Sequence, residues 1–345
     1  MIQLLAACAS SGVDSAAAAP SSVVLSQVTV PGVGQVDLFV SGGVFTKVGE
    51  ATPDGFEVRD MEGLYVVPAF IDSHVHLAFL PVGQGLTEGG VAAAVDLAAP
   101  LERIVDQPLR MLWSGPMVTA DGGYPTQGWG SNGYGLEVSG PDSARAAVRQ
   151  LHDQGMDLIK LPVTSGTTLS DASLRAAVDE AHDLGLKVAT HAMSDELARR
   201  AAVADIDVLA HTPTDPLSSQ TTEMWSNKAV VSTLSAFGNG PTARTNLVGL
   251  VDRGATLLYG TDLGNSSHAG IDPNELRALI DAGFTGDAIL EAGTSAPAAF
   301  WGFEELGAIE EGKAASFLVL DRDPSVDPMA LAEPVEVWMD GVRLK

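Results

Sequence analysis

The chain has 345 residues, of which 46% are hydrophobic and 6% aromatic, and its 44 acidic and 19 basic residues give a formal net charge of −25 at pH 7. This composition is typical of a globular protein of enzyme size. The acidic charge argues against nucleic acid as a partner, because phosphate binding requires a surface rich in Lys and Arg. The sequence also has no run of about 18 uncharged apolar residues, so it predicts no membrane-spanning segment.

The N-terminal segment contains the single cysteine of the chain, Cys8, which excludes an intramolecular disulfide and a cysteine zinc cluster. The sequence Leu5-Ala6-Ala7-Cys8 resembles the lipobox of bacterial lipoproteins, although Met1-Ile2-Gln3-Leu4 supplies no positive n-region and only a short h-region. We expect residues 1–22 to be a signal-like lipoprotein leader and tether, with a lipid anchor at Cys8 and the folded part outside the cytoplasm. The alternative is an ordinary N-terminus on a cytoplasmic protein.

Both ends of the chain are rich in short segments of β character. Residues 23–67 contain strand-like runs separated by Pro-Gly and Gly-Gly turn signals. Residues 316–339 also contain strand-like runs, which precede the turn signal Asp340-Gly341. Because the two ends share this pattern and flank a long middle region, we expect residues 23–67 and 304–345 to form one small β-sandwich domain.

The middle region alternates apolar runs with helical patterns, and this alternation predicts a parallel sheet covered by helices. Counting the run that ends at His74 and His76, there are eight such strands. A closed (β/α)8 TIM barrel over residues 68–303 is therefore favoured over an open doubly wound sheet. The other seven runs cover residues 91–97, 111–118, 156–163, 185–190, 206–210, 229–234 and 255–259, and helical patterns cover residues 143–154, 170–184, 195–204 and 274–282.

Metal-ligand residue types stand at the ends of several of these runs. Active-site side chains of a barrel project from the carboxyl ends of its strands. His74 and His76 are two positions apart, so both project to the same side of one strand and form a chelating pair. Imidazole and carboxylate ligands suit Zn²⁺, with Mn²⁺ or Fe²⁺ as alternatives. The candidate ligands are His74, His76, Lys160, His191, His211 and Asp262.

The order of these residues resembles the amidohydrolase superfamily, in particular its imidazolonepropionase-like and prolidase-like metal hydrolases. The resemblance covers residues 23–345. A lone His-x-His is a weak signal, whereas six ligand-type residues in the right order on successive strand ends are a strong one. The matching stretches are Val67-Pro68-Ala69-Phe70-Ile71-Asp72-Ser73-His74-Val75-His76, Gly260-Thr261-Asp262, Thr294-Ser295-Ala296-Pro297-Ala298 and the closing segment 307–317.

The resemblance implies a hydrolase that uses metal-activated hydroxide to cleave a C–N bond in an amide, a cyclic amide or an Xaa-Pro dipeptide. His74 and His76 would hold the more buried metal together with Asp262. His191 and His211 would hold a second metal. Asp262 would take the proton of the hydroxide and pass it to the leaving amine.

Lys160 separates the alternatives. The resemblance implies that CO₂ carboxylates its amine, and that this carbamate bridges two divalent ions, with Zn²⁺ favoured. If Lys160 instead pairs with a carboxylate, the site would be that of a mononuclear hydrolase or deaminase that uses His74, His76, His191 and Asp262. A third hypothesis is that the chain is a non-catalytic, lipid-anchored protein that binds a metal or a solute.

Two further residues are expected to contact substrate from loops. Tyr124 follows Gly122-Gly123, where relatives often carry a histidine, and its phenol can donate a hydrogen bond to an oxyanion. His268 lies in the loop after the eighth strand. His152 and His182 fall in amphipathic helical stretches and are expected at the surface or in helix packing. The expected partner is a small amide or peptide-like molecule, and assembly into a homo-oligomer stays open.

Overall fold

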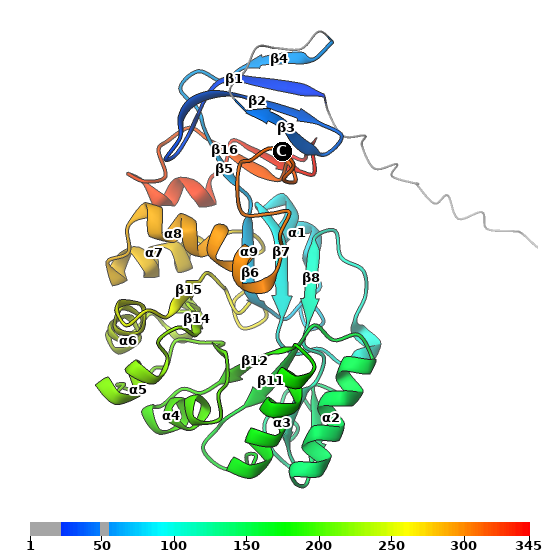
Figure 1. Ribbon diagram of the computed structural model, residues 1–345. Coiled ribbons are helices and arrows are strands. Elements are labelled where there is room, and N and C mark those ends of the chain that lie inside the picture. The colour runs from blue at the N-terminus through cyan, green and yellow to red at the C-terminus, as the bar shows by residue number, and fades with distance from the viewer. Residues whose placement is uncertain (1–21, 49–54) are drawn as a thin grey trace, which may run out of the picture.

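The computed structural model describes residues 22–48 and 55–345. The lipobox cysteine, Cys8, lies outside the described residues, so the lipid anchor and the location outside the cytoplasm stay predictions. None of the helices in the described ranges has the length and the apolar character that a membrane crossing requires. Figure 1 shows a β-sheet made from both chain ends, stacked on one end of a larger part in which parallel strands are accompanied by helices.

Both chain ends enter one eight-stranded sheet. Its strands are β1 (Val23–Val30), β2 (Gly34–Ser41), β3 (Val44–Val48), β4 (Glu57–Asp60), β5 (Tyr65–Pro68), β16 (Phe317–Leu320), β17 (Glu336–Met339) and β18 (Val342–Arg343). The order is β18-β17-β16-β5-β1-β2-β3, with β4 paired to β1. Strand β5 pairs with β16 over its whole length but meets β1 only at Thr29 and Tyr65. The sheet is continuous in its hydrogen bonding but folds over on itself, because Phe45 of β3 packs against Phe317 of β16 with ring centroids 5.6 Å apart. The β-sandwich stays a prediction.

This terminal sheet has an apolar core of its own. Side chains alternate between the two faces of a strand, and one face of β1 and β2 places Leu25 and Leu38 in a cluster with Phe317 and Trp338 from the other chain end. The Phe317 and Trp338 rings stack with their centroids 5.3 Å apart. Each chain end therefore buries apolar surface that the other end exposes, which explains why both ends carry strand patterns.

The middle of the chain forms two parallel sheets. Their strands are β6 (Phe70–Val75), β7 (Val91–Asp96) and β8 (Arg110–Trp113) in one, and β11 (Leu158–Pro162), β12 (Lys187–His191), β13 (Val208–Leu209), β14 (Ala229–Val231) and β15 (Thr256–Leu258) in the other. Backbone hydrogen bonds join the two sheets on both sides: the Asp157 N–H donates to the Trp113 carbonyl at 2.9 Å, and the Asp262 N–H donates to the His74 carbonyl at 2.9 Å. In the described part of the chain the strand pairing does not run continuously around all eight strands, so the closed barrel stays a prediction.

The third predicted strand, residues 111–118, is interrupted in the structure. Strand β8 ends at Trp113, and β9 (Met117–Ala120) begins after the break, pairs with β10 (Gly135–Val138) and lies beside β11. Gly115 has φ +64°, and a Cβ there would meet the Met156 sulfur at 2.8 Å. Pro116 follows and provides no N–H for a ladder. The Gly-Pro pair therefore ends one strand and starts another, and the prediction of one continuous strand was wrong.

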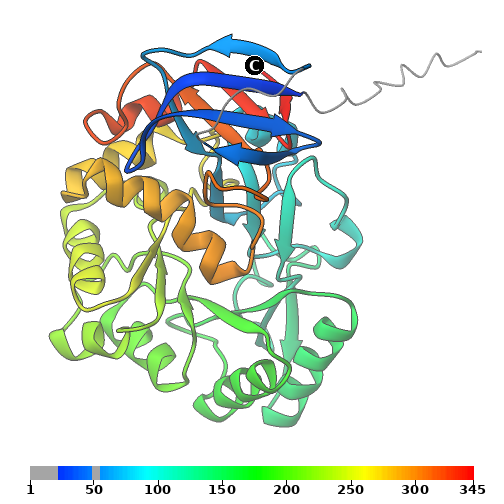
Figure 2. The ribbon, with the colours of Figure 1, turned by 45° about the horizontal axis from the view of Figure 1, so that its top comes forward.

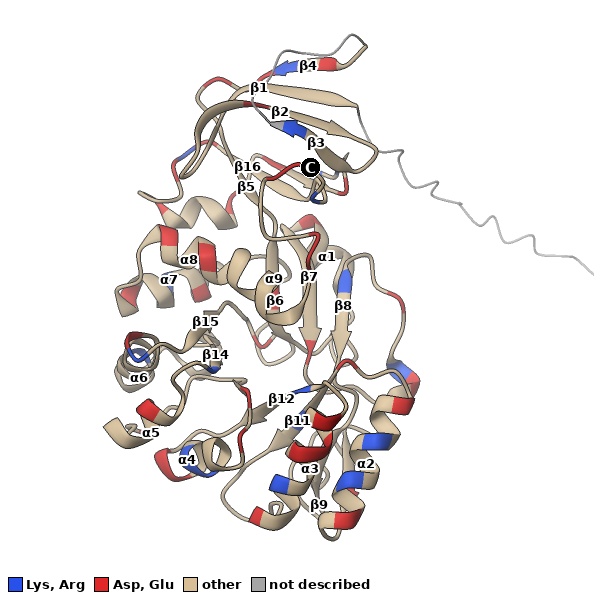
Figure 3. Ribbon diagram, in the orientation of Figure 1, with Lys and Arg blue, Asp and Glu red and all other residues tan. Residues whose placement is uncertain are grey.

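Helices follow most of the parallel strands and lie around their outside, as Figure 2 shows. All four predicted helical patterns are confirmed, as α2 (Pro141–Asp153), α3 (Asp171–Asp183), α4 (Asp195–Val203) and α7 (Pro273–Ala282). Charged residues concentrate on such outer helices in Figure 3, and His152 and His182 are exposed on α2 and α3, as expected. The other helices are α1 (Gly83–Glu88), α5 (Ser219–Met224), α6 (Pro241–Asp252), α8 (Gly286–Gly293) and α9 (Ser295–Trp301), with short 3-10 turns at Leu101–Arg103, Ser235–Phe237 and Pro328–Ala332.

Candidate metal centre

Strand β6 and the turn after β15 bring three ligand-type side chains together. The Nε2 atoms of His74 and His76 lie 3.2 Å apart. The Oδ1 atom of Asp262 lies 3.4 Å from the first and 3.2 Å from the second. Tetrahedral ligands at about 2.0–2.1 Å from Zn²⁺ stand roughly 3.3 Å from one another. The three atoms therefore have the mutual spacing that a divalent first-row ion needs, and all three residues are buried.

The backbone holds Asp262 in an unusual conformation. Its φ is +52°, in the left-handed region that residues with a Cβ rarely adopt. The hydrogen bond from its N–H to the His74 carbonyl fixes this turn against β6, and the Asn265 amide donates to Asp262 Oδ2 at 3.3 Å. Backbone strain at a buried polar residue is concentrated at functional sites. The turn after β15 thus places this carboxylate against the histidine pair.

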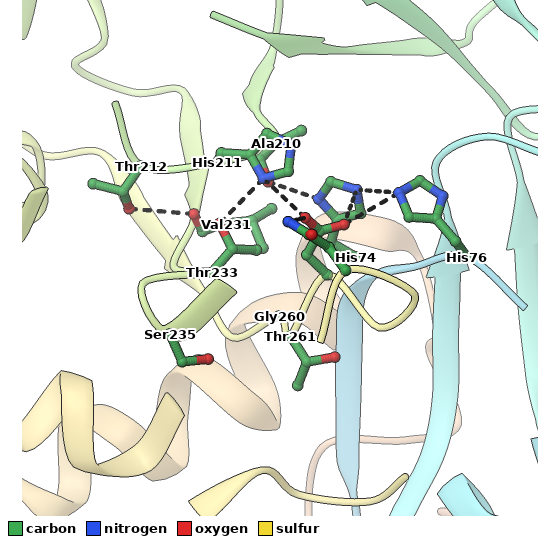
Figure 4. A network of polar contacts seen from close by, with 12 residues as sticks. His74, His76, Ala210, His211, Thr212, Val231, Thr233, Ser235, Gly260 and Thr261 are labelled. Carbon is green, nitrogen blue, oxygen red and sulfur yellow. Dashed lines mark hydrogen bonds and ion pairs between the residues drawn. The ribbon is translucent and has the colours of Figure 1, made fainter. Parts of the chain in front are cut away.

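Hydrogen bonds orient the imidazoles. His74 Nδ1 donates to the Ala210 carbonyl at 2.8 Å, since a carbonyl can only accept, and this leaves Nε2 as the lone-pair atom that faces the cluster. His211 Nδ1 lies 3.2 Å from Thr233 Oγ1. Figure 4 shows the His74, His76 and His211 rings converging on one region. Fixing one ring nitrogen in this way sets the tautomer and the direction of the other, as partners of metal-bound histidines do.

The remaining three predicted ligands line the same cavity but lie outside the tight cluster. The His211 ring centroid is 4.5 Å from that of His74 and 4.9 Å from that of His191. Lys160 projects from β11 into the same space. The cavity has a volume of about 240 Å³. All six residues predicted from strand ends are therefore lining residues of one cavity, with His74, His76 and Asp262 as its most compact group.

The Lys160 amine is buried without a hydrogen-bond partner among the described residues. The Lys160 side chain is 1% exposed, and His76 Nδ1 likewise has no hydrogen-bond partner in the part of the chain that the structure describes. Burial lowers the pKa of Lys160 from 10.5 to about 7, against the opposing field of Asp262. An unpaired buried ammonium is costly, so at pH 7 and above the neutral amine becomes a major form. A neutral amine is the form that reacts with CO₂, which fits the predicted carbamate.

Charge in the cavity also suits a cation. Burial lowers the pKa of His74 and of His211 well below the usual value, and lowers that of His191 to about 4. Burial acts to raise the pKa of Asp262, but the nearby His74 and the hydrogen bond with His76 outweigh it and hold the pKa well below its usual value. Neutral imidazoles and an ionised carboxylate are the forms that bind metals.

Two buried carboxylates that the sequence reasoning missed support the ligands. Asp72 accepts hydrogen bonds from the His74 N–H and from the Thr261 N–H and hydroxyl, and burial raises its pKa to about 7. Asp96 accepts from the N–H groups of Leu77 and Ala98, which follow the ends of β6 and β7. The available signal was an acidic residue inside each of two apolar runs. Both carboxylates tie together the strand ends that carry the cluster.

The two predicted substrate contacts have different outcomes. Tyr124 lines the cavity, stacks on His191 with ring centroids 5.5 Å apart, and accepts a hydrogen bond from Trp129 Nε1 at 2.9 Å. His268 is exposed and is not a lining residue, because the turn after β15 directs Asn265 to the cavity instead. The lining residues that were not predicted are mostly apolar, and all except Met117, the first residue of β9, lie in loops: Phe79, Met117, Trp129, Phe237, Gly264 and Asn265.

Comparison with known proteins agrees with this architecture. Residues 65–344 match the model of the amidohydrolase family, whereas no curated relative matches the chain by sequence. Similar solved structures include an Xaa-Pro dipeptidase with bound methionine (21% identity, TM-score 0.78, 90% of this chain and 95% of that one). Others are molinate hydrolase (20%, 0.77, 95% and 95%) and phenylurea hydrolase B (20%, 0.78, 94% and 97%). The chain belongs to the amidohydrolase family and is a hydrolase that acts on carbon–nitrogen bonds.

Proposed function

We propose that the protein hydrolyses an amide-type C–N bond of a small molecule at a binuclear metal centre inside a closed (β/α)8 barrel. The observation that carries this proposal is the combination of the compact His74, His76 and Asp262 group with a buried, unpartnered Lys160 amine in the same cavity. Burying these polar side chains without partners costs free energy. A bound metal would supply the missing partners and so explain why they are buried together.

His74, His76 and Asp262 would hold one divalent ion, and His191 and His211 would hold the other. Zn²⁺ is favoured by the imidazole and carboxylate donors. When bound, such ions activate water at neutral pH and polarise a carbonyl group. The lowered pKa values of His74, His191 and His211, which burial causes, keep these three imidazoles in the neutral form that binds a metal.

Lys160 would complete the centre as a carbamate. The neutral amine attacks CO₂: an N–C bond forms, the π electron pair of one C=O bond moves to oxygen, and one N–H proton leaves, so that a neutral buried amine becomes an anion with two ligand oxygens. The lowered pKa of Lys160, about 7 because of burial, makes the reacting form available near neutral pH. An ammonium would repel two dications, whereas a carbamate attracts both.

Two side chains would act on the substrate itself. Asp262 would accept a proton at a carboxylate oxygen and deliver it to the leaving nitrogen. Tyr124 already accepts a hydrogen bond from Trp129 at its phenol oxygen, so its own O–H is free to donate into the cavity. This O–H would stabilise negative charge on the carbonyl oxygen of the substrate.

A mononuclear centre is the second candidate. It is favoured by the fact that His74, His76 and Asp262 alone satisfy the compact ligand geometry. In that case Lys160 would remain an amine beside the single ion.

The test is metal removal followed by reconstitution. Chelation should abolish hydrolysis across a panel of amides, cyclic amides and dipeptides, and Zn²⁺ should restore it more fully when bicarbonate is present. Full activity after exhaustive metal removal would refute the proposal. Restoration that does not respond to bicarbonate would refute the carbamate.

A further inference from the structure

The cavity combines its ligand cluster with walls of apolar side chains. Phe79, Met117, Trp129 and Phe237 line it together with the candidate ligands. Phe237, in the turn after β14, packs edge-on to His211 with ring centroids 4.8 Å apart, so an apolar ring borders the reaction site directly. The remaining wall therefore favours an apolar part of a substrate over a polar one.

Two of these rings are also open to solvent. Phe79 is 53% exposed and Trp129 is 41% exposed, and their ring centroids lie 6.1 Å apart. The Trp129 ring centroid in turn lies 6.0 Å from the ring centroid of His76. The aromatic rings therefore extend from the protein surface to a candidate ligand. Adjacent large apolar side chains left in water mark a surface that binds an apolar partner.

Beyond the ions of the proposed centre, the described lining of the cavity provides no Lys or Arg side chain that could pair with a substrate anion. Among its lining residues Lys160 is the single Lys or Arg, and the proposed centre uses it. The Trp129 N–H donates to Tyr124, and the Asn265 amide donates to Asp262. A substrate carboxylate would lie against aromatic walls with Asp262 in the same space. A carboxylate buried there without a Lys or Arg partner is disfavoured.

The volume limits the size of the apolar group. An apolar protein cavity of about 150 Å³ takes up one benzene molecule. The cavity here is about 240 Å³, which leaves room for one ring together with the scissile group. A larger group would extend past the exposed Phe79 and Trp129 rings into solvent.

We infer that the substrate is an uncharged amide, carbamate or urea with a single aromatic ring or an apolar group of similar size, and without a carboxylate near the scissile bond. This inference rests on the proposed function and narrows it. It separates the protein from a dipeptidase acting on free Xaa-Pro, whose proline carboxylate would meet no partner in this cavity.

Matched substrate pairs test the inference on the metal-loaded full chain. The first pair is N-ethylbenzamide and N-benzoyl-L-alanine, and the second is acetanilide and 4-acetamidobenzoate; each pair differs by one carboxylate. We expect the neutral member to have a kcat/KM at least about 50-fold higher, the effect of one unpaired buried charge. Equal values, or a preference for the carboxylated members, would overturn the inference.

Two substitutions locate the effect. Phe79→Arg places a cation at the cavity entrance, on a side chain exposed enough to be replaced without loss of folding. It should raise kcat/KM for the carboxylated members about 10-fold relative to their neutral partners. Val326→Arg adds the same charge at an 81% exposed site outside the cavity lining and should leave the ratio unchanged. An unchanged ratio in both variants would contradict the assignment of this wall.

Binding is measured separately from hydrolysis by saturation-transfer NMR on the metal-loaded protein with the same four compounds. The ring protons of the neutral members should receive saturation, and Phe237→Ala should weaken this signal at least about fivefold. Phe300→Ala is the matched control, because Phe300 packs over Lys187 at the start of β12 and does not line the cavity. Neutral binding without hydrolysis would refute the proposed function and support the substrate class. Binding that favours the carboxylated members would overturn the substrate class, and absence of binding by all four compounds would overturn both.

Discussion

Charged groups in the terminal sheet and charged groups in the cavity are treated in opposite ways. Glu336 on β17 is largely buried, and each of its oxygens is occupied: Arg59 binds it through both guanidinium nitrogens, Trp338 Nε1 donates at 2.9 Å and Arg343 donates at 3.3 Å. Lys160 is more deeply buried, yet its amine has no partner among the described residues.

This difference indicates what each group is for. Buried charge that is fully paired contributes little beyond holding its own strands in register. An unpaired buried charge lowers the free energy of unfolding. Proteins keep such a group where binding a ligand or catalysing a reaction requires it. The terminal sheet is therefore expected to respond to mutation through stability, and the cavity through activity and metal content.

The largest expected effect is that of Asp262→Asn. The amide keeps the shape of the side chain but can neither carry the negative charge nor accept the proton, so kcat/KM should fall by about 10³-fold or more. Steady-state kinetics on a substrate found in the panel measures this. Asp252→Asn, an exposed change on α6, is the control and should have no effect. Unchanged turnover in Asp262→Asn would exclude its role as a base.

Lys160→Met should make the metal-free protein more stable while removing its activity. Because the folded pKa of Lys160 is about 7 and its usual value is 10.5, the unfolded chain binds a proton that the folded chain does not. Wild-type stability therefore falls as pH drops from about 10.5 to about 7. The variant lacks this slope and should be about 2 kcal/mol more stable at pH 7.

Denaturant unfolding of the metal-free proteins measures this difference. Lys228→Met is the matched control, because Lys228 donates to Asp205 and to the Ile206 carbonyl at 2.8 Å each and should lose stability instead. Loss of stability in both lysine variants would show that Lys160 has a structural partner.

Glu336→Gln should have a moderate effect on stability and none on kcat/KM. Burial acts to raise the pKa of Glu336, but hydrogen bonds from Arg59 and Trp338 outweigh it and hold the pKa below its usual value. The stabilisation is therefore present above the unfolded pKa of about 4.5 and is lost as pH falls through the lower folded value. We expect a loss of about 1 kcal/mol at pH 7.

The pH dependence distinguishes charge from packing. The difference between Glu336→Gln and wild type should vanish in acid, where both side chains are neutral, whereas a constant difference from pH 3 to pH 7 would point to packing. Glu57→Gln, an exposed change on β4 of the same sheet, should stay near zero throughout.

The smallest expected effect is that of His268→Ala. The side chain is exposed and does not line the cavity, so kcat/KM should change by less than about twofold, as for most surface substitutions. A larger loss would mean that the loop after β15 closes over the substrate.

The strand-end rule explains how much of the site could be predicted from sequence. The ends of parallel strands meet at one edge, so the rule brings His74, His191 and His211 together without knowledge of side-chain contacts. It does not apply to side chains supplied by loops. Phe237 and His268 both follow strand ends, yet the first lines the cavity and the second is exposed, because turn geometry decides between them.

Two features of the fold were out of reach for a related reason. The Gly115-Pro116 break divides a run whose apolar character is continuous, and periodicity alone does not register it. The single residue pair that joins β5 to β1 depends on pairing between segments far apart in sequence, which local patterns do not register. Asp72 and Asp96 appeared as isolated acids in apolar runs, and their hydrogen bonds to strand ends explain them.

The most direct test of the central claim is the number of metal ions per chain. Inductively coupled plasma mass spectrometry measures it on protein reconstituted with Zn²⁺ and bicarbonate. We predict two ions in the wild type and one in Lys160→Ala, because the buried amine at position 160 would become the ligand that both ions share. One ion in both proteins, or none in either, would contradict the account.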